Sequence, residues 1–520
     1  PGTLDPAQGK AAKRELKERY QYVLAGMVSM GNLDADEAAK YEKRLPEFPE
    51  IPEVSNYGGQ RGYLLNLVEQ KLQQLKFTDE EINGGGLKVV TTLSWQDSIA
   101  AAKAVTEERP EGRPQLHVAL SAVDPRTGAL RAMIGGRDYT GGGPKDQVNF
   151  ALAPTQVGST MKAYAVAAGL KDGFTLRDTF DGNSPYTYPN GETVRNEGQS
   201  SGNPTGNSYG AAIPLTYATQ ESVNTAFADL TSRMKNGPQK VVDAAVAAGV
   251  PKESPDLEPN LGVALGSATI PNVEMAEGYS TFADNGVHHD WYVIEKVTDA
   301  NGLRYEHKIQ GDRAFTPAIS SNVTYALEQV VKDGTGAAAQ ALERPAAGKT
   351  GTATFGTADN QYVSSSWFVG FTPQLSTAIT YTRGDGNDSL EGYLEPFFGA
   401  NYPTQTWTSF MEKALAGSPE LDFPEPAELH GENPTYSPPP TTSEPPTTTS
   451  EPPTTTSEPP TTTSEPPTTT SEPPTTTSEP PTTPSEPTDT CPILGCPTTS
   501  TTTTTTDEED PDPPGAGPDG

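Results

Sequence analysis

The sequence predicts an α+β domain in which one antiparallel sheet, flanked by helices, is assembled from both ends of the domain. Two short β-type segments joined by a turn open this domain within residues 116–134. Helical patterns fill its middle, and two further β-type segments close it within residues 365–382. Strands at both ends with helices between them are typical of a mixed fold in which distant strands meet in one sheet.

Two helices and a small linker module are expected before this domain. Residues 1–50 should contain two helices, over 11–30 and from an acidic first turn at 33–38, and the prolines within 47–52 should end this part. Residues 51–115 form the expected linker module. Its predicted elements are a helix over 57–76, a glycine turn at 84–86, a strand over 87–93 and a helix over 96–105.

The main domain is expected to span residues 116–424. A polar stretch over 181–210 is either a loop beside the active-site cleft or an ordinary surface excursion, and both interpretations stay open. The predicted strands are 117–123, 129–134, 365–371 and 377–382, and the predicted helices begin at Gly158 or cover 214–234, 239–248 and 320–331.

The composition changes at Glu425: residues 425–520 contain 17 of the 68 acidic residues and no Lys or Arg. Ser-Glu-Pro-Pro-Thr-Thr-Thr repeats from Ser443, and the repeat lacks the apolar positions of a coiled coil. We therefore expect residues 425–520 to form a disordered, acidic Pro/Thr/Ser-rich tail. The net charge of −32 argues against nucleic acid and anionic lipid surfaces as partners.

Cysteine and histidine usage gives no sign of a metal or cofactor. Cys491 and Cys496 both lie in the tail, where they either close a small loop or remain thiols. His288 and His289 are expected to be solvated turn residues. No apolar run is long enough to cross a membrane, but the chain starts at Pro1, so an anchoring N-terminal part can be missing. We predict no metal and no cofactor.

The candidate nucleophile is Ser159, which opens a helical segment at Gly158 and is followed three residues later by Lys162. That spacing places the hydroxyl and the amine on one face of the helix. Lysine can activate a serine only when burial or a neighbouring cation lowers its pKa. The amide groups at the helix start can also stabilise a developing oxyanion.

Ser-x-x-Lys alone is a weak signal, since Ser232 begins a second copy of it. Ser159 is preferred because it opens a helix, whereas Ser232 lies late in one. Two later motifs, Ser222-Val223-Asn224 and Lys349-Thr350-Gly351, complete with Ser159 the three-part signature of penicillin-interacting serine enzymes. Ser232 with the Ser-Ser-Asn run at 320–322 is the rival set.

From residue 57 to about 416 the chain resembles the linker and transpeptidase portion of class A penicillin-binding proteins, the bifunctional peptidoglycan synthases. Residues 1–50 resemble the C-terminal end of the glycosyltransferase domain of that family, without its catalytic acids, so no glycan polymerisation is expected from this chain. The stretches that carry the resemblance are 86–93, 124–128, 132–136, 158–162, 334–336, 348–353 and 367–371.

The resemblance implies roles for named residues. Ser159 would attack the penultimate D-alanine of a stem pentapeptide, and Lys162 would take its proton. Ser222 would relay a proton to the leaving amine, and Asn224 would bind a substrate amide. The segment Lys349-Thr350-Gly351-Thr352 would bind the substrate, with Lys349 and the two threonine hydroxyls on its terminal carboxylate. The backbone amides of Ser159 and Thr352 would form the oxyanion hole.

The implied function is a D,D-transpeptidase that β-lactams acylate and inhibit, acting at the outer face of a bacterial cytoplasmic membrane. Its implied partners are stem peptides carrying D-Ala-D-Ala, an amine acceptor and other cell-wall synthesis proteins, and its longer parent would also polymerise glycan. The family often has Arg-x-Pro before Gly158 and an Asp at the position of Ser366. These departures leave the shape of the donor pocket open.

Three alternative functions fit the sequence less well. Lys349 does not end a phosphate-binding loop, because Glu343 stands where that loop needs glycine. A β-lactamase or carboxypeptidase would need a base for a deacylating water, and the sequence offers no candidate. A non-catalytic peptidoglycan- or β-lactam-binding module would not need the full catalytic set.

Overall fold

The computed structural model describes residues 9–46, 57–141, 144–199, 202–357 and 360–430. The chain separates into two compact units, residues 1–55 and residues 56–520. In the first unit, α1 (Lys10–Ser29) is followed by α2 (Ala35–Tyr41). The Asp34 carboxylate caps α2 by accepting a hydrogen bond from the Asp36 amide at 2.8 Å. The two predicted helices are thereby confirmed, while the predicted break at 47–52 lies outside the described residues.

The second unit is built on a five-stranded antiparallel sheet with strand order β14-β15-β16-β2-β3. Strand β2 pairs with β16 over its whole length, so the first strands of the domain join the last ones, as the sequence predicted. The α+β prediction is confirmed. The strands are β2 (Leu116–Val123), β3 (Leu130–Ile134), β14 (Ala347–Thr357), β15 (Asn360–Thr372) and β16 (Leu375–Arg383).

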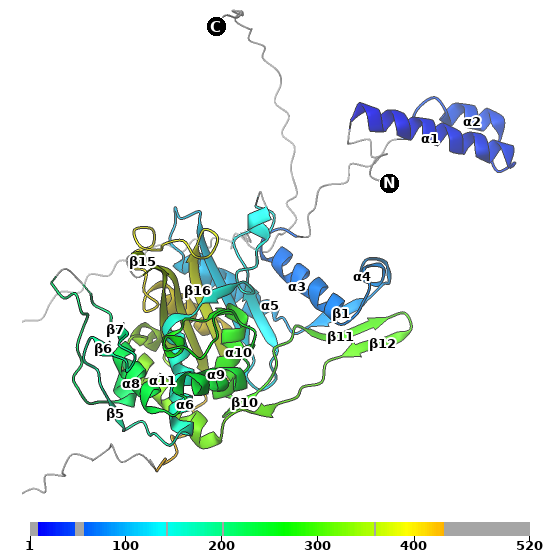
Figure 1. The fold of residues 1–520 in the computed structure, drawn as a ribbon. Helices are drawn as coiled ribbons and strands as arrows, with labels where there is room; N and C mark the ends of the chain where they lie inside the picture. The colour runs from blue at the N-terminus through cyan, green and yellow to red at the C-terminus, as the bar shows by residue number, and fades with distance from the viewer. Residues whose placement is uncertain (1–8, 47–56, 142–143, 200–201, 358–359, 431–520) are drawn as a thin grey trace, which may run out of the picture. The chain divides into compact units, whose positions relative to one another are not determined.

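Helices cover both faces of this sheet (Figure 1). On one face lie α10 and α11, with α6 packed against α11 and α9, and this side holds the larger apolar core. On the other face α5 and α12 pack together against the sheet. The helices are α5 (Trp95–Glu108), α6 (Lys162–Lys171), α7 (Leu215–Gln220), α8 (Asn224–Arg233), α9 (Gly237–Ala247), α10 (Asn272–Ala283), α11 (Pro317–Asp333) and α12 (Tyr402–Ala414).

The part of the chain that was predicted to be a linker module contains α3 (Gln60–Gln74), α4 (Asp79–Gly84) and β1 (Lys88–Thr91) ahead of α5. A capping box between Thr78 and Glu81 starts α4, a short helix that was not predicted and that ends where the glycine turn was expected. Strand β1 does not pair within the module. It pairs with β11 (Ile294–Asp299), which in turn pairs with β12 (Gly302–Glu306), so a hairpin 200 residues later completes the linker sheet (Figure 1).

The remaining described elements are short. Several of them belong to the polar stretch and its borders. They are η3 (Pro144–Gln147), β4 (Pro154–Gln156), η4 (Gly158–Met161), β5 (Thr179–Phe180), β6 (Tyr186–Thr187), β7 (Thr193–Val194), β8 (Ile213–Pro214), η5 (Val263–Leu265), β9 (Thr269–Pro271), β10 (Val287–His288), β13 (Asp312–Arg313) and η6 (Ala337–Leu342).

Residues 421–430 return to the domain after α12 and lie against α11; we call them the C-terminal strap. The Phe423 ring packs edge-on against Phe371 of the sheet, with centroids 5.5 Å apart. The Ala427 carbonyl accepts a hydrogen bond from Asn322 at 2.8 Å, and its amide donates to Ser321. The first residues of the acidic stretch that begins at Glu425 are therefore packed on the domain, and the rest of that stretch lies outside the described residues.

Candidate active site

Ser159 lies in η4, a single 3-10 turn that leads directly into α6. The predicted helix start is thus correct, with a tighter first turn than an α-helix. Gly158 has a φ of 55°, and a Cβ there would lie 2.8 Å from the Thr352 carbonyl oxygen of β14. Glycine is therefore required for the nucleophile turn to approach β14 so closely.

Neighbouring hydrogen bonds fix the position of this turn. Tyr279 of α10 donates from its hydroxyl to the Thr160 carbonyl at 2.6 Å. On the other side, the Trp367 indole N–H and the Ser365 hydroxyl of β15 both donate to the Gln156 carbonyl, at 2.8 and 2.7 Å. Sequence reasoning did not assign these supporting residues, although Trp367 lies in a stretch that carries the family resemblance.

Lys162 is completely buried, and its Nζ lies 2.8 Å from Ser159 Oγ. The same nitrogen lies 2.8 Å from the Ser222 carbonyl oxygen, 3.1 Å from Ser222 Oγ and 2.6 Å from Asn224 Oδ1. Burial lowers the pKa of Lys162 to about 7, and the negative charge of Glu197 opposes that shift. A neutral amine can donate to the Ser222 carbonyl and the Asn224 amide while it accepts the serine proton.

Ser222 and Asn224 reach Lys162 because the chain breaks the predicted helix over 214–234 into α7 and α8. Ser222 lies between the two helices with a φ of 57°, in the left-handed region. This conformation turns both its carbonyl and its hydroxyl toward Lys162. The prediction of one continuous helix was wrong, because the interaction with Lys162 determines the backbone at this point and not helix propensity.

The polar stretch over 181–210 borders the site. Of its two interpretations, the loop beside the active site is therefore the correct one. The Asn224 side-chain amide donates to the Arg195 carbonyl at 3.0 Å. Asn196 is buried, accepts from the Thr225 amide at 3.0 Å and donates to the Thr225 hydroxyl at 3.1 Å. The loop therefore orients Asn224, and it also carries Glu197, which acts electrostatically on Lys162.

Lys349 lies on β14 and is completely buried, and its Nζ donates to the Thr350 carbonyl at 3.2 Å. Burial and then the positive charge of Lys162 lower the pKa of Lys349 well below its usual value, while Glu221 opposes the shift. One long hydrogen bond leaves most of the donor capacity of an ammonium group unused. A bound carboxylate would supply the missing acceptors and charge.

The three residues that follow Lys349 also lie on β14. The Thr350 hydroxyl is 2.8 Å from that of Thr335, which sequence reasoning had quoted but given no role. Thr352 is half-buried, and the Gly399 amide donates weakly to its hydroxyl at 3.4 Å. Gly351 is buried against the nucleophile turn, because a Cβ there would lie 2.7 Å from the Val157 carbonyl oxygen. Its position indicates a packing requirement.

The structure thus brings together Ser159, Lys162, Ser222 and Asn224 through direct contacts, and it places Lys349–Thr352 on the strand beside the nucleophile turn. The rival Ser232 lies in the last turn of α8 and donates to the Ala228 carbonyl of its own helix at 2.8 Å. The three rival residues 320–322 are buried within α11. The catalytic and binding roles of these residues remain predictions, and the observed geometry is compatible with them.

The two histidines expected to be solvated are partly or fully buried, so that expectation was wrong. The His288 ring lies 2.9 Å from the carboxylate of Glu277, which is buried in α10, and the His289 ring lies 3.0 Å from Asp284. Glu277, His288 and Asp290 are the one metal-sized group of side chains within the described residues. Glu277 also accepts from the Trp291 amide at 3.1 Å, so it is already engaged and we assign no ion there.

Known proteins resemble this chain in sequence and in structure. The penicillin binding protein transpeptidase domain matches residues 118–388. Penicillin-binding protein 1A of Mycobacterium tuberculosis is 32% identical over 451 residues, and that of Mycolicibacterium smegmatis is 31% identical over 457 residues; each match covers 83% of this chain. These matches cover 52% and 54% of the relatives, so the chain spans about half their length.

Solved structures give the same result. The structure described as that of the PonA1 protein from Mycobacterium tuberculosis in complex with penicillin V is similar with a TM-score of 0.63 and 31% identity. The match covers 73% of this chain and all of that one. Penicillin-Binding Protein 1A from Haemophilus influenzae also has a TM-score of 0.63, and at 18% identity it supports the fold alone. No described helix is both long and apolar enough to span a membrane.

Proposed function

The chain belongs to the penicillin-binding protein transpeptidase family, and from this we propose that it is a serine D,D-transpeptidase that cross-links peptidoglycan stem peptides. The observation that carries the proposal is the 2.8 Å contact between Ser159 Oγ and the fully buried Lys162 Nζ, whose pKa is lowered to about 7. A lysine with this pKa is partly neutral at physiological pH and can accept a proton. We infer that Lys162 accepts the hydroxyl proton of Ser159.

In the proposed first step, Ser159 Oγ attacks the carbonyl carbon of the penultimate D-alanine, and its proton moves to Lys162 Nζ. The backbone amides of Ser159 and Thr352 stabilise the oxyanion. The C–N bond to the terminal D-alanine then breaks. Ser222, whose hydroxyl lies 3.1 Å from Lys162 Nζ, passes a proton from the lysine to the leaving amine. An acyl-enzyme on Ser159 and free D-alanine remain.

In the proposed second step, an amine of a neighbouring stem peptide attacks the acyl carbon, and Lys162 takes the amine proton. The ester bond to Ser159 breaks, and the hydroxyl regains a proton. During the first step, before the terminal D-alanine leaves, Lys349 holds the terminal carboxylate of the donor with the hydroxyls of Thr350 and Thr352, and Asn224 binds an amide of the donor. The buried lysine pair supports this division of work, because each positive charge disfavours the other.

β-Lactams would acylate the same serine. Their ring amide would take the place of the D-Ala-D-Ala peptide bond, and their carboxylate would take the place of the terminal carboxylate of the stem peptide. Transfer to an amine is favoured over hydrolysis because the described residues bring no carboxylate into hydrogen-bond contact with Ser159 or Lys162. The substrate places the enzyme in the wall space outside a bacterial membrane. The longer parent protein would also carry glycosyltransferase activity.

Intact-mass analysis after brief exposure to benzylpenicillin, followed by a chase in drug-free buffer, tests this function. We expect one adduct that persists through the chase and maps to Ser159. Ser159→Ala should abolish it, and Ser232→Ala is the matched control that should keep it. Persistence of the adduct in Ser159→Ala would refute the site assignment. Loss of the adduct within seconds would instead identify a β-lactamase, and absence of any adduct a binding module.

A further inference from the structure

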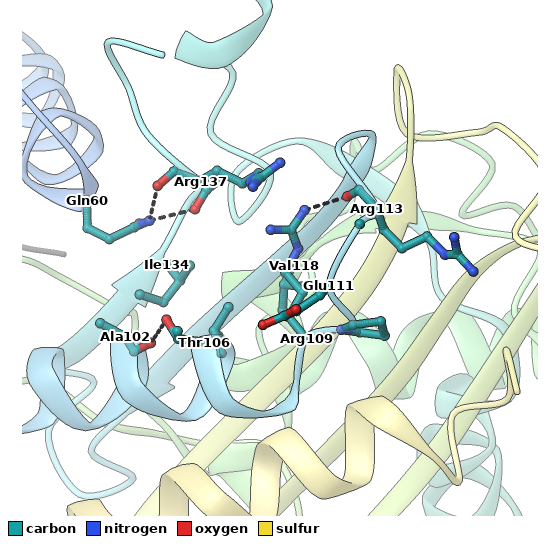
Figure 2. A pocket seen from close by; sticks show the side chains of 13 residues that line it. Gln60, Ala102, Thr106, Arg109, Glu111, Arg113, Val118, Ile134 and Arg137 are labelled. Carbon is teal, nitrogen blue, oxygen red and sulfur yellow. Dashed lines mark hydrogen bonds between the residues drawn. The ribbon is translucent and has the colours of Figure 1, made fainter. Parts of the chain in front are cut away.

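A cavity of about 510 Å³ lies away from the catalytic groups, where the linker meets the transpeptidase sheet. Its walls come from α5, the loop that follows α5, the start of α3, and strands β2 and β3 (Figure 2). Strand β3 is one edge of the five-stranded sheet, and β14, which carries Lys349, is the opposite edge. The volume lies within the range of small-molecule sites.

The floor of this cavity is apolar and rigid. Val118 of β2 and Ile134 of β3 are buried, and Ala102 of α5 is buried beside them. Val105, one turn further along α5, is half-buried and completes the floor. These side chains belong to regular elements of the core, so the floor is formed before any ligand arrives.

Three arginines, Arg109, Arg113 and Arg137, line the cavity above this floor (Figure 2). Arg109 donates from Nη2 to the carbonyls of Arg113 and Leu116 at 2.8 and 2.6 Å. Arg137 donates to the Pro114 carbonyl at 3.4 Å. These acceptors are neutral, so the contacts hold the guanidinium groups in place without compensating their charge.

The charge of this group is unbalanced within the described residues. Burial and the positive charge of Arg137 lower the pKa of Arg109 to about 10, and no carboxylate opposes that effect. Arg109 Nε is buried without a hydrogen-bond partner. Glu111 lines the same cavity but forms no ion pair with Arg109 or Arg137, whose acceptors are backbone carbonyls. A half-buried arginine in such a setting lacks the anion that would normally accompany it.

We propose that this cavity binds a small organic anion, with its carboxylate or phosphate on Arg109 and Arg137 and its apolar part on the floor. Planar guanidinium groups suit such oxyanions because they donate two parallel hydrogen bonds. The anion could be a free molecule or an acidic run of the chain itself. The four acidic residues at 507–510 have the required chemistry.

Isothermal titration calorimetry of the full chain with phenyl phosphate tests the proposal, with inorganic phosphate and benzyl alcohol as partial probes. We expect one site per chain and weaker binding of each partial probe. Arg137→Gln should weaken phenyl phosphate binding about tenfold. Arg137 is exposed and makes one long hydrogen bond, so the fold should persist. The matched control is Arg126→Gln, an exposed arginine of the β2–β3 turn, which should bind normally.

A second variant separates a pocket from a charged surface. Val105→Phe fills the space above the floor and keeps all three arginines, so it should also lose phenyl phosphate binding. If the melting temperature of this variant falls sharply, the Arg137→Gln result by itself decides whether the proposal stands. A variant in which the four acidic residues at 507–510 are replaced by their amides tests whether the chain's own acidic run occupies the cavity. If phenyl phosphate binds only to this variant, that acidic run supplies the oxyanion in the unchanged chain. Absence of binding in both chains, or binding that Arg137→Gln leaves unchanged, would overturn the proposal.

Discussion

Ser222 combines backbone strain with a functional contact in one residue. A non-glycine residue with a φ of 57° costs on the order of 1 kcal/mol or more. In return, its carbonyl and hydroxyl both contact Lys162 Nζ. The strain therefore lies at the point where the proposed proton transfers occur, and glycine would relieve it without moving the backbone.

Ser222→Gly should raise the stability of the protein by about 1 kcal/mol because glycine adopts this φ freely. The same change removes the hydroxyl that relays the proton, so acylation by penicillin should slow by about a hundredfold. Thermal unfolding and the rate of labelling with a fluorescent penicillin measure the two effects. A variant that is both stable and fully active would rule out the relay role of Ser222.

The pKa of Lys162 predicts how acylation depends on pH. The neutral amine is the active form, and the pKa of about 7 means that its fraction rises as pH increases through 7. The second-order rate of penicillin labelling should therefore increase about tenfold per pH unit below 7 and level off above it. Rates measured from pH 5.5 to 8.5 at constant ionic strength provide the test. A profile that is flat below pH 7 would exclude Lys162 as the base.

At the scale of elements, α11 connects the strap to the substrate strand. In the first half of α11, Asn322 donates a hydrogen bond to the Ala427 carbonyl of the strap. The C-terminal end of α11 leads to Thr335, whose hydroxyl contacts that of Thr350. Helix α11 also packs directly on β14. Glu328 of this helix faces Glu425 and Asp422 of the strap, with Lys332 nearby. Burial and then the charge of Glu425 raise the pKa of Glu328 to about 7.

This raised pKa predicts a loss of stability as pH rises. The folded protein holds a proton on Glu328 that the unfolded chain releases near pH 4.5, so stability is lost between pH 4.5 and 7. The loss should be about 1 to 2 kcal/mol after allowance for solvent screening. Glu328→Gln should remove this part of the pH dependence and raise the melting temperature at pH 8. Glu412→Gln, an exposed acid on α12, is the control that should change neither.

At the scale of the whole molecule, the sequence predicted four of the five strands of the sheet and most helices, and it singled out four residues that the structure brings into contact around Lys162. It missed β14 and α10. Lys349-Thr350-Gly351 lies in the interior of β14, yet the glycines at 348 and 351 weaken its strand pattern. Gly351 is explained only by contact with the nucleophile turn. The pairing of β1 with β11 depends on residues far apart in the sequence, which periodicity does not report. The carboxylate partners of His288 and His289 lie on α10 and at its C-terminal end, so they were missed together with that helix.

Two deletions distinguish the strap from the rest of the C-terminal stretch. Removal of residues 431–520 should leave the melting temperature within about 2 °C, because the Pro/Thr/Ser-rich repeat in this part of the sequence lacks the apolar residues that packing needs. Removal of residues 421–520 should lower it by several degrees, because the Phe423 contact with Phe371 and the Ala427 hydrogen bonds are lost. Differential scanning calorimetry measures both. Equal melting temperatures would mean that the strap adds no stability.

The pairing of β2 with β16 also determines how the domain responds to mechanical load. Leu116, where the chain enters the sheet, lies opposite Arg383, where the sheet strands end. A pull between the linker and the C-terminal segment therefore acts first on this strand pair and on the strap. Strand β14 lies two strands further on, with α11 and the nucleophile turn against it. Load on the β2–β16 pair therefore reaches β14 only through β15, whereas load on the strap reaches β14 through α11.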